Sequence, residues 1–257
     1  MNQSKFSLIP SIVVQGGQTP MPPSGPMLSE VTQTTPKNAA MEWLNQNVSR
    51  LLIIDADAQA GTGDNHEVIA AAVKAANHRA LIEVSGGVRD AASLDRALGH
   101  LGHVVADASI IDSPEALALG TSTHGDRFVI ELKVRDGAHV VAPGASIDGR
   151  PVTETIIALD GLGVTRYYVT DVAHHDHWKH GNLHLMQTVC AVTPHLITCG
   201  AGVKSLEDIH QLVEIGEQGL EGAVIGHALF NGAFMYADAQ AAVEARYDPY
   251  EWGPAQP

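Results

Sequence analysis

Cysteine is scarce in this chain of 257 residues, which contains only Cys190 and Cys199. Two thiols are too few for a disulfide framework or for a zinc site built from thiolates. We therefore expect a protein of the reducing cytoplasm. Long apolar runs are also missing, because none reaches the roughly 18 residues that a membrane-spanning helix needs. The sequence thus predicts no membrane span.

Positive charge is scarce as well: 15 Lys and Arg residues stand against 29 Asp and Glu residues, and the formal net charge is −14. A general nucleic-acid-binding protein needs basic patches that neutralise phosphates. An anionic membrane surface attracts the same basic patches. The composition therefore argues against both partners. With 45% hydrophobic and 17% charged residues, the chain has enough apolar surface to fold as a globular protein.

Eight short apolar runs recur along the chain, and segments with helical periodicity lie between most of them. The runs are Phe6–Val14, Leu51–Ala56, Ala80–Ser85, His103–Ala106, Phe128–Val134, Tyr167–Val172, His195–Cys199 and Gly222–Ile225. The clearest helical segments are Glu67–Val73, Ser93–Leu98 and Leu206–Val213. Because buried parallel strands read as continuous apolar runs, this alternation indicates one (β/α)8 barrel over residues 1–257. Residues 248–257 are expected to form a poorly ordered tail.

A doubly wound open sheet is the alternative architecture. It typically carries a Gly-x-Gly-x-x-Gly turn after its first strand, whereas this chain has Gln15–Pro20, which does not fit. A short internal sequence repeat favours the barrel. Ser85–Arg89 and Cys199–Lys204 each lead from a strand, through small residues and a basic residue, to a helix. A repeat at half the chain length indicates a duplicated half-barrel.

A series of motifs resembles, in order, those of the HisA and PriA isomerases of histidine biosynthesis. They are Leu8–Val14, Ile54–Ala58 with Gly61–Asn65, Glu83–Asp90, Val169–Val172 with Gly181 and Asn182, Gly200–Leu206 and Val224–Leu229. The resemblance covers nearly the whole chain and implies a (β/α)8 barrel without a cofactor. It also implies an Amadori rearrangement of a phosphoribosyl imidazole carboxamide ribotide or, in PriA, of phosphoribosylanthranilate. One carboxylate then serves as base and another as acid.

The catalytic positions implied by the resemblance are changed in this chain. Val13 stands in the first strand where the family has the basic aspartate, and a valine cannot move a proton. Lys133 stands where the fifth strand carries another aspartate. The family's acid aligns with His175, or with Asp176 after a slip of one residue. We expect Asp171, His175 or Asp176, and Lys133 to carry the remaining chemistry.

Lys133, Asp171 and Cys199 each have a structural interpretation besides a functional one. Lys133 is either a desolvated amine that acts as a base or Schiff-base former, or a partner of Glu83 or Asp55 in the barrel mouth. Asp171 either takes part in the chemistry or caps the loop after the sixth strand. Cys199, at the end of the seventh strand, is more often a packing residue than a nucleophile.

Two phosphate cradles are implied, because the family's substrate carries a phosphate at each end and small residues let backbone N–H groups approach an anion. The first is formed by Ser85, Gly86, Gly87 and Arg89, and the second by Thr170, Gly200, Ala201, Gly202, Gly226 and His227. Asp107 replaces a family threonine beside the first cradle. A carboxylate that faces a phosphate at about 4 Å costs about 4 kcal/mol per charge pair. We therefore expect the second cradle to survive and the first to be lost or altered, unless Asp107 points outward.

Histidines gather just after the sixth strand. They include His174, His175, His177 and His180, with Asp176 among them. Imidazoles at this spacing can converge on Zn, Fe, Mn or Ni. A histidine acid or base without a metal, and a solvated loop that titrates near neutral pH, are the other interpretations.

Three functions follow from these observations. The first is an enzyme that descends from the HisA and PriA isomerases and acts on a phosphorylated ribosyl or related small molecule with changed chemistry. The second is a metal-dependent lyase or hydrolase of a specialised pathway that uses the histidine-rich loop. The third is a non-catalytic protein that binds a ligand or a partner. A barrel alone does not decide among them. The sequence leaves the oligomeric state open, with a monomer as the expectation.

Overall fold

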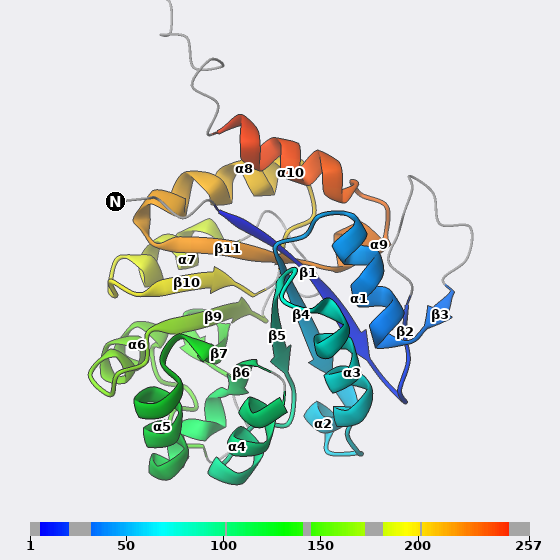
Figure 1. Cartoon of the computed structure of the whole chain (residues 1–257). Coiled ribbons are helices and arrows are strands. Elements are labelled where there is room, and N and C mark those ends of the chain that lie inside the picture. The colour runs from blue at the N-terminus through cyan, green and yellow to red at the C-terminus, as the bar shows by residue number, and fades with distance from the viewer. Residues whose placement is uncertain are drawn as a thin grey trace, which may run out of the picture.

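Eight parallel strands form a closed barrel in the computed structural model, which describes residues 6–20, 32–100, 102–140, 145–172, 182–200 and 202–246 (Figure 1). The barrel strands are β1 (Ser7–Val14), β4 (Arg50–Asp55), β5 (Leu81–Ser85), β6 (His103–Asp107), β7 (Phe128–Arg135), β9 (Arg166–Asp171), β10 (Leu196–Cys199) and β11 (Leu220–Ile225). The order is β6-β5-β4-β1-β11-β10-β9-β7, and β6 pairs with β7 to close the ring. The predicted barrel and all eight predicted strands are confirmed.

Helices surround this barrel and cover its outer face (Figure 1). They are α1 (Pro36–Asn45), α2 (Ala56–Ala60), α3 (His66–Ala76), α4 (Ala91–His100), α5 (Pro114–Leu119), α6 (Val152–Asp160), α7 (Leu183–Cys190), α8 (Leu206–Ile215), α9 (His227–Phe230) and α10 (Tyr236–Ala245). The shorter elements are β2 (Thr19–Pro20), β3 (Gln33–Thr34), β8 (Ala138–His139), η1 (Ala108–Asp112), η2 (Gly120–His124), η3 (Gly125–Arg127) and η4 (Gly216–Gln218). In the part of the chain that the structure describes, no helix is long and apolar enough to cross a bilayer.

Local sequence signals explain where several helices begin. The Thr35 side chain accepts a hydrogen bond from the backbone N–H of Asn38, and Pro36 follows at the first helical position of α1. A capping box of Ser205 and Asp208 starts α8. Each of these helices packs an apolar stripe against the barrel, as Trp43 of α1 does with no exposed surface.

The barrel interior is filled in layers, because alternate residues of each strand point inward. One apolar layer lies near the middle and consists of Ile9, Leu52, Val105, Val129, Tyr168 and Val224. It is a packed core rather than a pore, so a ligand site in the barrel must lie beyond this layer.

Four buried charges fill the interior toward the N-terminal strand ends. Arg50 pairs with Glu83 at 3.0 Å and with Glu221 at 3.2 Å, while Arg166 pairs with Glu221 at 2.7 Å and with Glu83 at 3.4 Å. The Tyr168 hydroxyl donates to Glu83 at 2.6 Å. Burial alone would raise the pKa of Glu221, but the two guanidinium groups outweigh it and lower that pKa. These charges are therefore satisfied by one another and belong to the scaffold.

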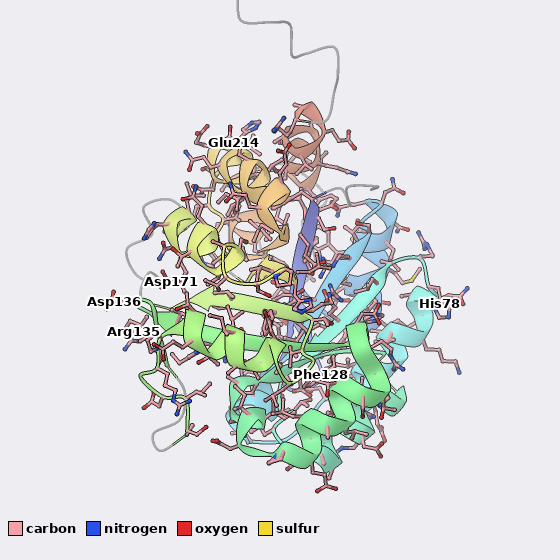
Figure 2. All side chains as sticks on the ribbon, turned by 90° about the vertical axis from the view of Figure 1, so that its left-hand side faces the viewer. His78, Phe128, Arg135, Asp136, Asp171 and Glu214 are labelled. Carbon is pink, nitrogen blue, oxygen red and sulfur yellow. The ribbon has the colours of Figure 1, made fainter. Side chains whose placement is uncertain are left out.

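The opposite end of the barrel, formed by the C-terminal strand ends, is its mouth. Figure 2 shows Arg135 and Asp171, at the ends of β7 and β9, on one side of the molecule, and His78, which precedes β5, on the other. The two segments of the sequence repeat follow β5 and β10, which stand four positions apart in the ring of eight strands. This spacing agrees with the predicted half-barrel repeat and puts the two expected phosphate cradles on opposite sides of the mouth.

Candidate active site at the barrel mouth

Val13 faces the mouth from β1. Its side chain is 47% exposed, whereas Ile12 and Val14 on either side of it are buried at 1% and 0%. This alternation is that of a strand whose odd residues point inward. The position expected for a catalytic base therefore carries an aliphatic side chain that is open to solvent.

A polar group lies across the mouth from Val13, because β7 stands four positions from β1 in the ring. Lys133 Nζ is 3.6 Å from Glu131 Oε2 and 3.9 Å from Asp107 Oδ2. Thr170 Oγ1 donates to Glu131 Oε1 at 3.1 Å. We call Asp107, Glu131, Lys133 and Thr170 the mouth cluster. All four side chains are half-buried or buried at the end of adjacent strands β6, β7 and β9.

The pairing of Lys133 differs from the sequence-based prediction. Glu83 is engaged deep in the barrel by Arg50 and Arg166. The Asp55 carboxylate accepts from Asn65 at 2.7 Å. Lys133 pairs with Asp107 and Glu131 instead, so the predicted pairing with Glu83 or Asp55 is wrong. Sequence reasoning missed Glu131, although it lies two residues before Lys133 and therefore on the same face of β7.

Asp171 is buried at the end of β9, where its Oδ2 accepts a hydrogen bond from Asn182 Nδ2 at 2.5 Å. Asn182 also caps α7, since its Oδ1 accepts from the backbone N–H of Leu185 at 2.9 Å. Asp171 thus ties the strand end to the start of the next helix. This geometry agrees with its structural interpretation as a residue that fixes the following loop.

The glycines of the first cradle are required for packing. Gly86 and Gly87 have φ of 114° and 76°, a region that favours glycine. A β-carbon at Gly86 would lie 2.4 Å from the carbonyl oxygen of Asp55, and one at Gly87 would lie 2.8 Å from Ala58 Cβ. Arg89 Nη2 donates to the carbonyl of Gln59 at 2.6 Å. These residues hold the β5 loop against the start of α2.

The carboxylate of Asp107 places a negative charge at this side of the mouth. Its Oδ1 accepts from the backbone N–H of Ser109 at 2.9 Å, at the start of η1, while its backbone N–H donates to Val88 at 3.1 Å. Its Oδ2 faces Lys133. The carboxylate points toward the mouth cluster, and the outward orientation considered from the sequence is not observed. Ser85, the last residue of β5, is buried beside it.

The glycines of the second cradle pack closely against side chains of neighbouring strands. A β-carbon at Gly200 would lie 2.0 Å from Thr170 Oγ1, and one at Gly226 would lie 2.2 Å from Ser11 Oγ. Gly202 has φ of 117°, which again favours glycine. His227 is exposed at the start of α9, with its ring 3.0 Å from Asn231 Nδ2. Ala201 lies outside the described residues.

Several predicted residues fall where the structure gives no description. His174, His175, Asp176, His177 and His180 lie outside the described residues, as does the tail 248–257. Among the residues that are described, no group of three or more His, Cys, Asp or Glu side chains is placed to hold a metal.

Cys199 is 2% exposed at the end of β10, and burial raises the pKa of the neighbouring Cys190 thiol to about 12. A buried thiol at the end of the strand agrees with the packing role expected for Cys199.

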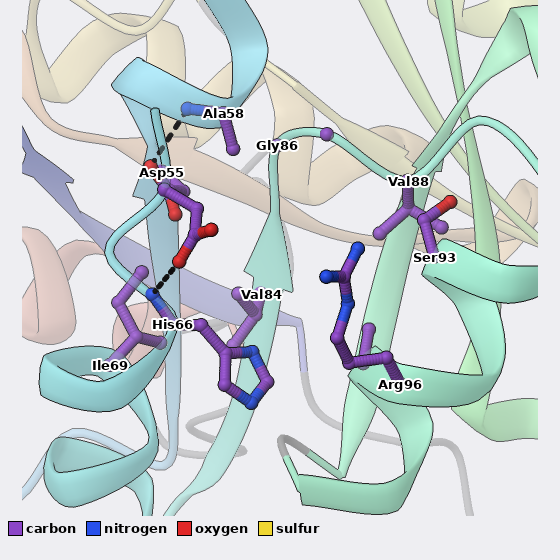
Figure 3. Close-up of a pocket in the computed structure, with 12 residues that line it drawn as sticks. Asp55, Ala58, His66, Ile69, Val84, Gly86, Val88, Ser93 and Arg96 are labelled. Carbon is purple, nitrogen blue, oxygen red and sulfur yellow. Dashed lines mark hydrogen bonds between the residues drawn. The ribbon is translucent and has the colours of Figure 1, made fainter. Parts of the chain in front are cut away.

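A separate hollow lies outside the barrel, between α3 and α4. Figure 3 shows His66 and Arg96 pointing into it from opposite sides, with Gly86 and Val88 at its upper edge. Its lining also includes Gly87 of the first cradle and Asp55 at the end of β4.

Comparison with known proteins decides the family. A family model described as "Histidine biosynthesis protein" matches residues 7–235. The chain belongs to this family. It is 36% identical to a phosphoribosyl isomerase A of Streptomyces griseus subsp. griseus over 242 residues, which cover 94% of this chain and 99% of the relative. The resemblance to HisA and PriA isomerases is confirmed.

Other members of the histidine biosynthesis family give similar values. A phosphoribosyl imidazole-4-carboxamide isomerase of Rhodococcus erythropolis is 35% identical over 240 residues, covering 92% of this chain and 98% of the relative. An isomerase with the same name from Thermobifida fusca is 35% identical over 239 residues, covering 93% and 96%. The chain therefore spans nearly the whole length of these relatives.

Proposed function

We propose that the protein is an enzyme of the histidine biosynthesis family that binds a phosphorylated ribosyl or related small molecule, and that its chemistry has diverged from the Amadori isomerisation. The observation that carries this proposal is the exposed Val13 side chain at the mouth. Proton abstraction there needs a carboxylate or another base within hydrogen-bond reach of the substrate. A valine supplies none.

The contacts of the neighbouring carboxylates support the proposal that none of them replaces the base. Asp55, at the end of the adjacent strand β4, accepts hydrogen bonds from Asn65 and from the backbone N–H of Ala58 at 3.0 Å. Asp107 and Glu131 lie near Lys133 on the far side of the ring. Asp55 is therefore hydrogen-bonded to the protein, and Asp107 and Glu131 are paired with Lys133.

Binding of a phosphate is supported at the second cradle. The second cradle keeps Gly200, Gly202 and Gly226, and small residues let backbone N–H groups approach an anion. On the opposite side, Asp107 places a negative charge beside the first cradle. The proposal therefore assigns the phosphate of the ligand to the β10 and β11 side of the mouth.

Turnover assays with the imidazole carboxamide ribotide and with phosphoribosylanthranilate test the proposed divergence. We expect the wild-type protein to be poor with both. For phosphoribosylanthranilate, whose single phosphate the second cradle can hold, Val13→Asp should raise turnover by at least about 100-fold, because general acid–base catalysis contributes about 10²–10⁴-fold. Ile157→Asp is the matched control, since it adds the same carboxylate at a position that is 56% exposed on α6. Wild-type turnover equal to that of an ordinary isomerase contradicts the proposal.

A metal-dependent activity of the histidine-rich loop stays a separate prediction. Its residues, His174, His175, His177 and His180, lie outside the described residues. Elemental analysis of protein purified without a histidine tag tests it. A stoichiometric transition metal that is lost in a His175→Ala and His177→Ala double variant would favour the metal-dependent lyase or hydrolase.

A further inference from the structure

The mouth cluster offers hydrogen-bond donors and acceptors. It lies beside the first cradle, where the Asp107 carboxylate already accepts from the backbone N–H of Ser109. We propose that it binds the hydroxyl groups of a sugar that carries a single phosphate, so that the ligand is a sugar monophosphate and not a bisphosphate. This inference rests on the proposed function, because it takes the second cradle as the phosphate site.

Asp107 is the first reason. Where a second phosphate would need free backbone donors, the N–H of Ser109 already donates to Asp107 Oδ1 at 2.9 Å. The side chain of Asp107 is 33% exposed, so its charge faces the mouth and is not hidden in the core. A phosphate at this place would have to displace or lie against a carboxylate that is fixed to the protein. The carboxylate thus acts as a built-in substitute for the ligand's second anion.

The charge of the cluster is the second reason. Two carboxylates, Asp107 and Glu131, share the single ammonium of Lys133, which lies 3.9 Å and 3.6 Å from them. With these groups ionised the cluster carries a net charge of about −1 and repels a phosphate. A ligand amine would compete with Lys133 for the same two carboxylates.

Hydroxyl groups of a ligand fit the mouth cluster better than a phosphate or an amine does. A hydroxyl donates one hydrogen bond and accepts others, so it can donate to a carboxylate while it accepts from the ammonium. Hydrogen bonds to charged groups are also stronger than those between neutral groups. Adjacent hydroxyls of a sugar could therefore engage Glu131, Lys133 and Asp107 together.

The position of the cluster is the third reason. Asp107 ends β6 and Gly226 follows β11, and these strands stand four positions apart in the ring. A phosphate held near Gly226 places the other end of a small sugar across the mouth, toward the cluster. The two ends of the site therefore differ in chemistry: one suits an anion and the other suits a polyol.

Fructose 6-phosphate and fructose 1,6-bisphosphate test the inference, because they differ by one phosphate. Isothermal titration calorimetry with the full chain should show the monophosphate binding at least tenfold more tightly. Asp107→Asn should then tighten the bisphosphate at least tenfold relative to the monophosphate. Asparagine caps a helix about as well as aspartate does, so the variant keeps the acceptor for Ser109 and removes the charge. Urea unfolding checks that it is folded.

Glu214→Gln is the control for the loss of one negative charge, because Glu214 is exposed at the far end of α8 (Figure 2). It should leave the preference unchanged. Equal or tighter binding of the bisphosphate by the wild-type protein overturns the inference and leaves the proposed function standing. Binding of inorganic phosphate without binding of fructose 6-phosphate also overturns it. If inorganic phosphate and both sugars fail to bind, the proposed function itself fails.

Discussion

Gly200 and Thr170 approach so closely that a β-carbon on residue 200 would stand 2.0 Å from the threonine hydroxyl oxygen and 3.1 Å from its Cβ. Thr170 is the next-to-last residue of β9 and Gly200 directly follows β10, and Thr170 also donates to Glu131. The phosphate cradle and the mouth cluster are thus joined through one side chain. A disturbance of the cradle should therefore reach the cluster.

Gly200→Ala should destabilise the protein by about 1–3 kcal/mol, the usual cost of forcing an extra methyl group into a packed site. Urea unfolding measures this change. Gly99→Ala is the matched control, because a β-carbon at Gly99 meets nothing within 4 Å and alanine favours the helix α4. The control should leave stability unchanged or raise it by up to about 1 kcal/mol. Equal effects of the two substitutions would contradict the close approach.

The buried charge network makes a second prediction. Glu83 has no exposed side-chain surface and pairs with Arg50 and Arg166. Glu83→Gln removes one of the two carboxylates that neutralise them and should cost about 3–5 kcal/mol in the free energy of unfolding, since Glu221 alone then faces both buried guanidinium groups.

Glu217→Gln is the comparison for this loss. Glu217 pairs with Arg246 at 3.2 Å, but its side chain is 61% exposed. A pair in solvent contributes about 0–1 kcal/mol. A cost for Glu83→Gln as small as that for Glu217→Gln would show that the barrel interior tolerates the loss of one carboxylate between the two arginines.

Sequence patterns sufficed for the barrel because most residues of its strands are buried and the strands read as apolar runs. The same alternation explains why Val13 faces the mouth between two buried neighbours. The ion-pair partners of Lys133 and Glu83 could not be predicted from this alternation. Lys133 finds Asp107 on a neighbouring strand, and the partners of Glu83 come from β4 and β9. Such contacts depend on strand register and side-chain reach, which periodicity does not encode.

The turn after β1 is hydrogen-bonded to helix α2, which follows β4, and this leads to a third prediction. Asp57 Oδ2 accepts from the backbone N–H of Gly16 at 2.7 Å and from Asn65 Nδ2 at 2.8 Å. The hydrogen bond from Asn65, and then that from Gly16, lowers the pKa of Asp57. Its contribution to stability is therefore present above the unfolded pKa of about 3.9 and is lost as the pH falls through the lower folded value.

Asp57→Asn should remove that contribution. The wild-type protein should be more stable than the variant at pH 7, and the difference should shrink toward pH 3. Urea unfolding across this range measures both. A difference that is constant with pH would contradict a role for the ionised carboxylate in holding the loop.

His139 gives the fourth prediction, because it is 2% exposed on β8, opposite Val134 of β7. Burial lowers the pKa of its imidazole. In the unfolded chain the imidazole has a pKa of about 6.5 and therefore binds a proton more readily than in the folded protein. Stability therefore falls as the pH drops below about 6.5. His139→Leu should flatten the decline measured by urea unfolding between pH 7 and pH 5, whereas His210→Ala, at an exposed position of α8, should keep the wild-type slope. If His139→Leu also keeps the wild-type slope, the imidazole takes up its proton in the folded protein as readily as in the unfolded chain.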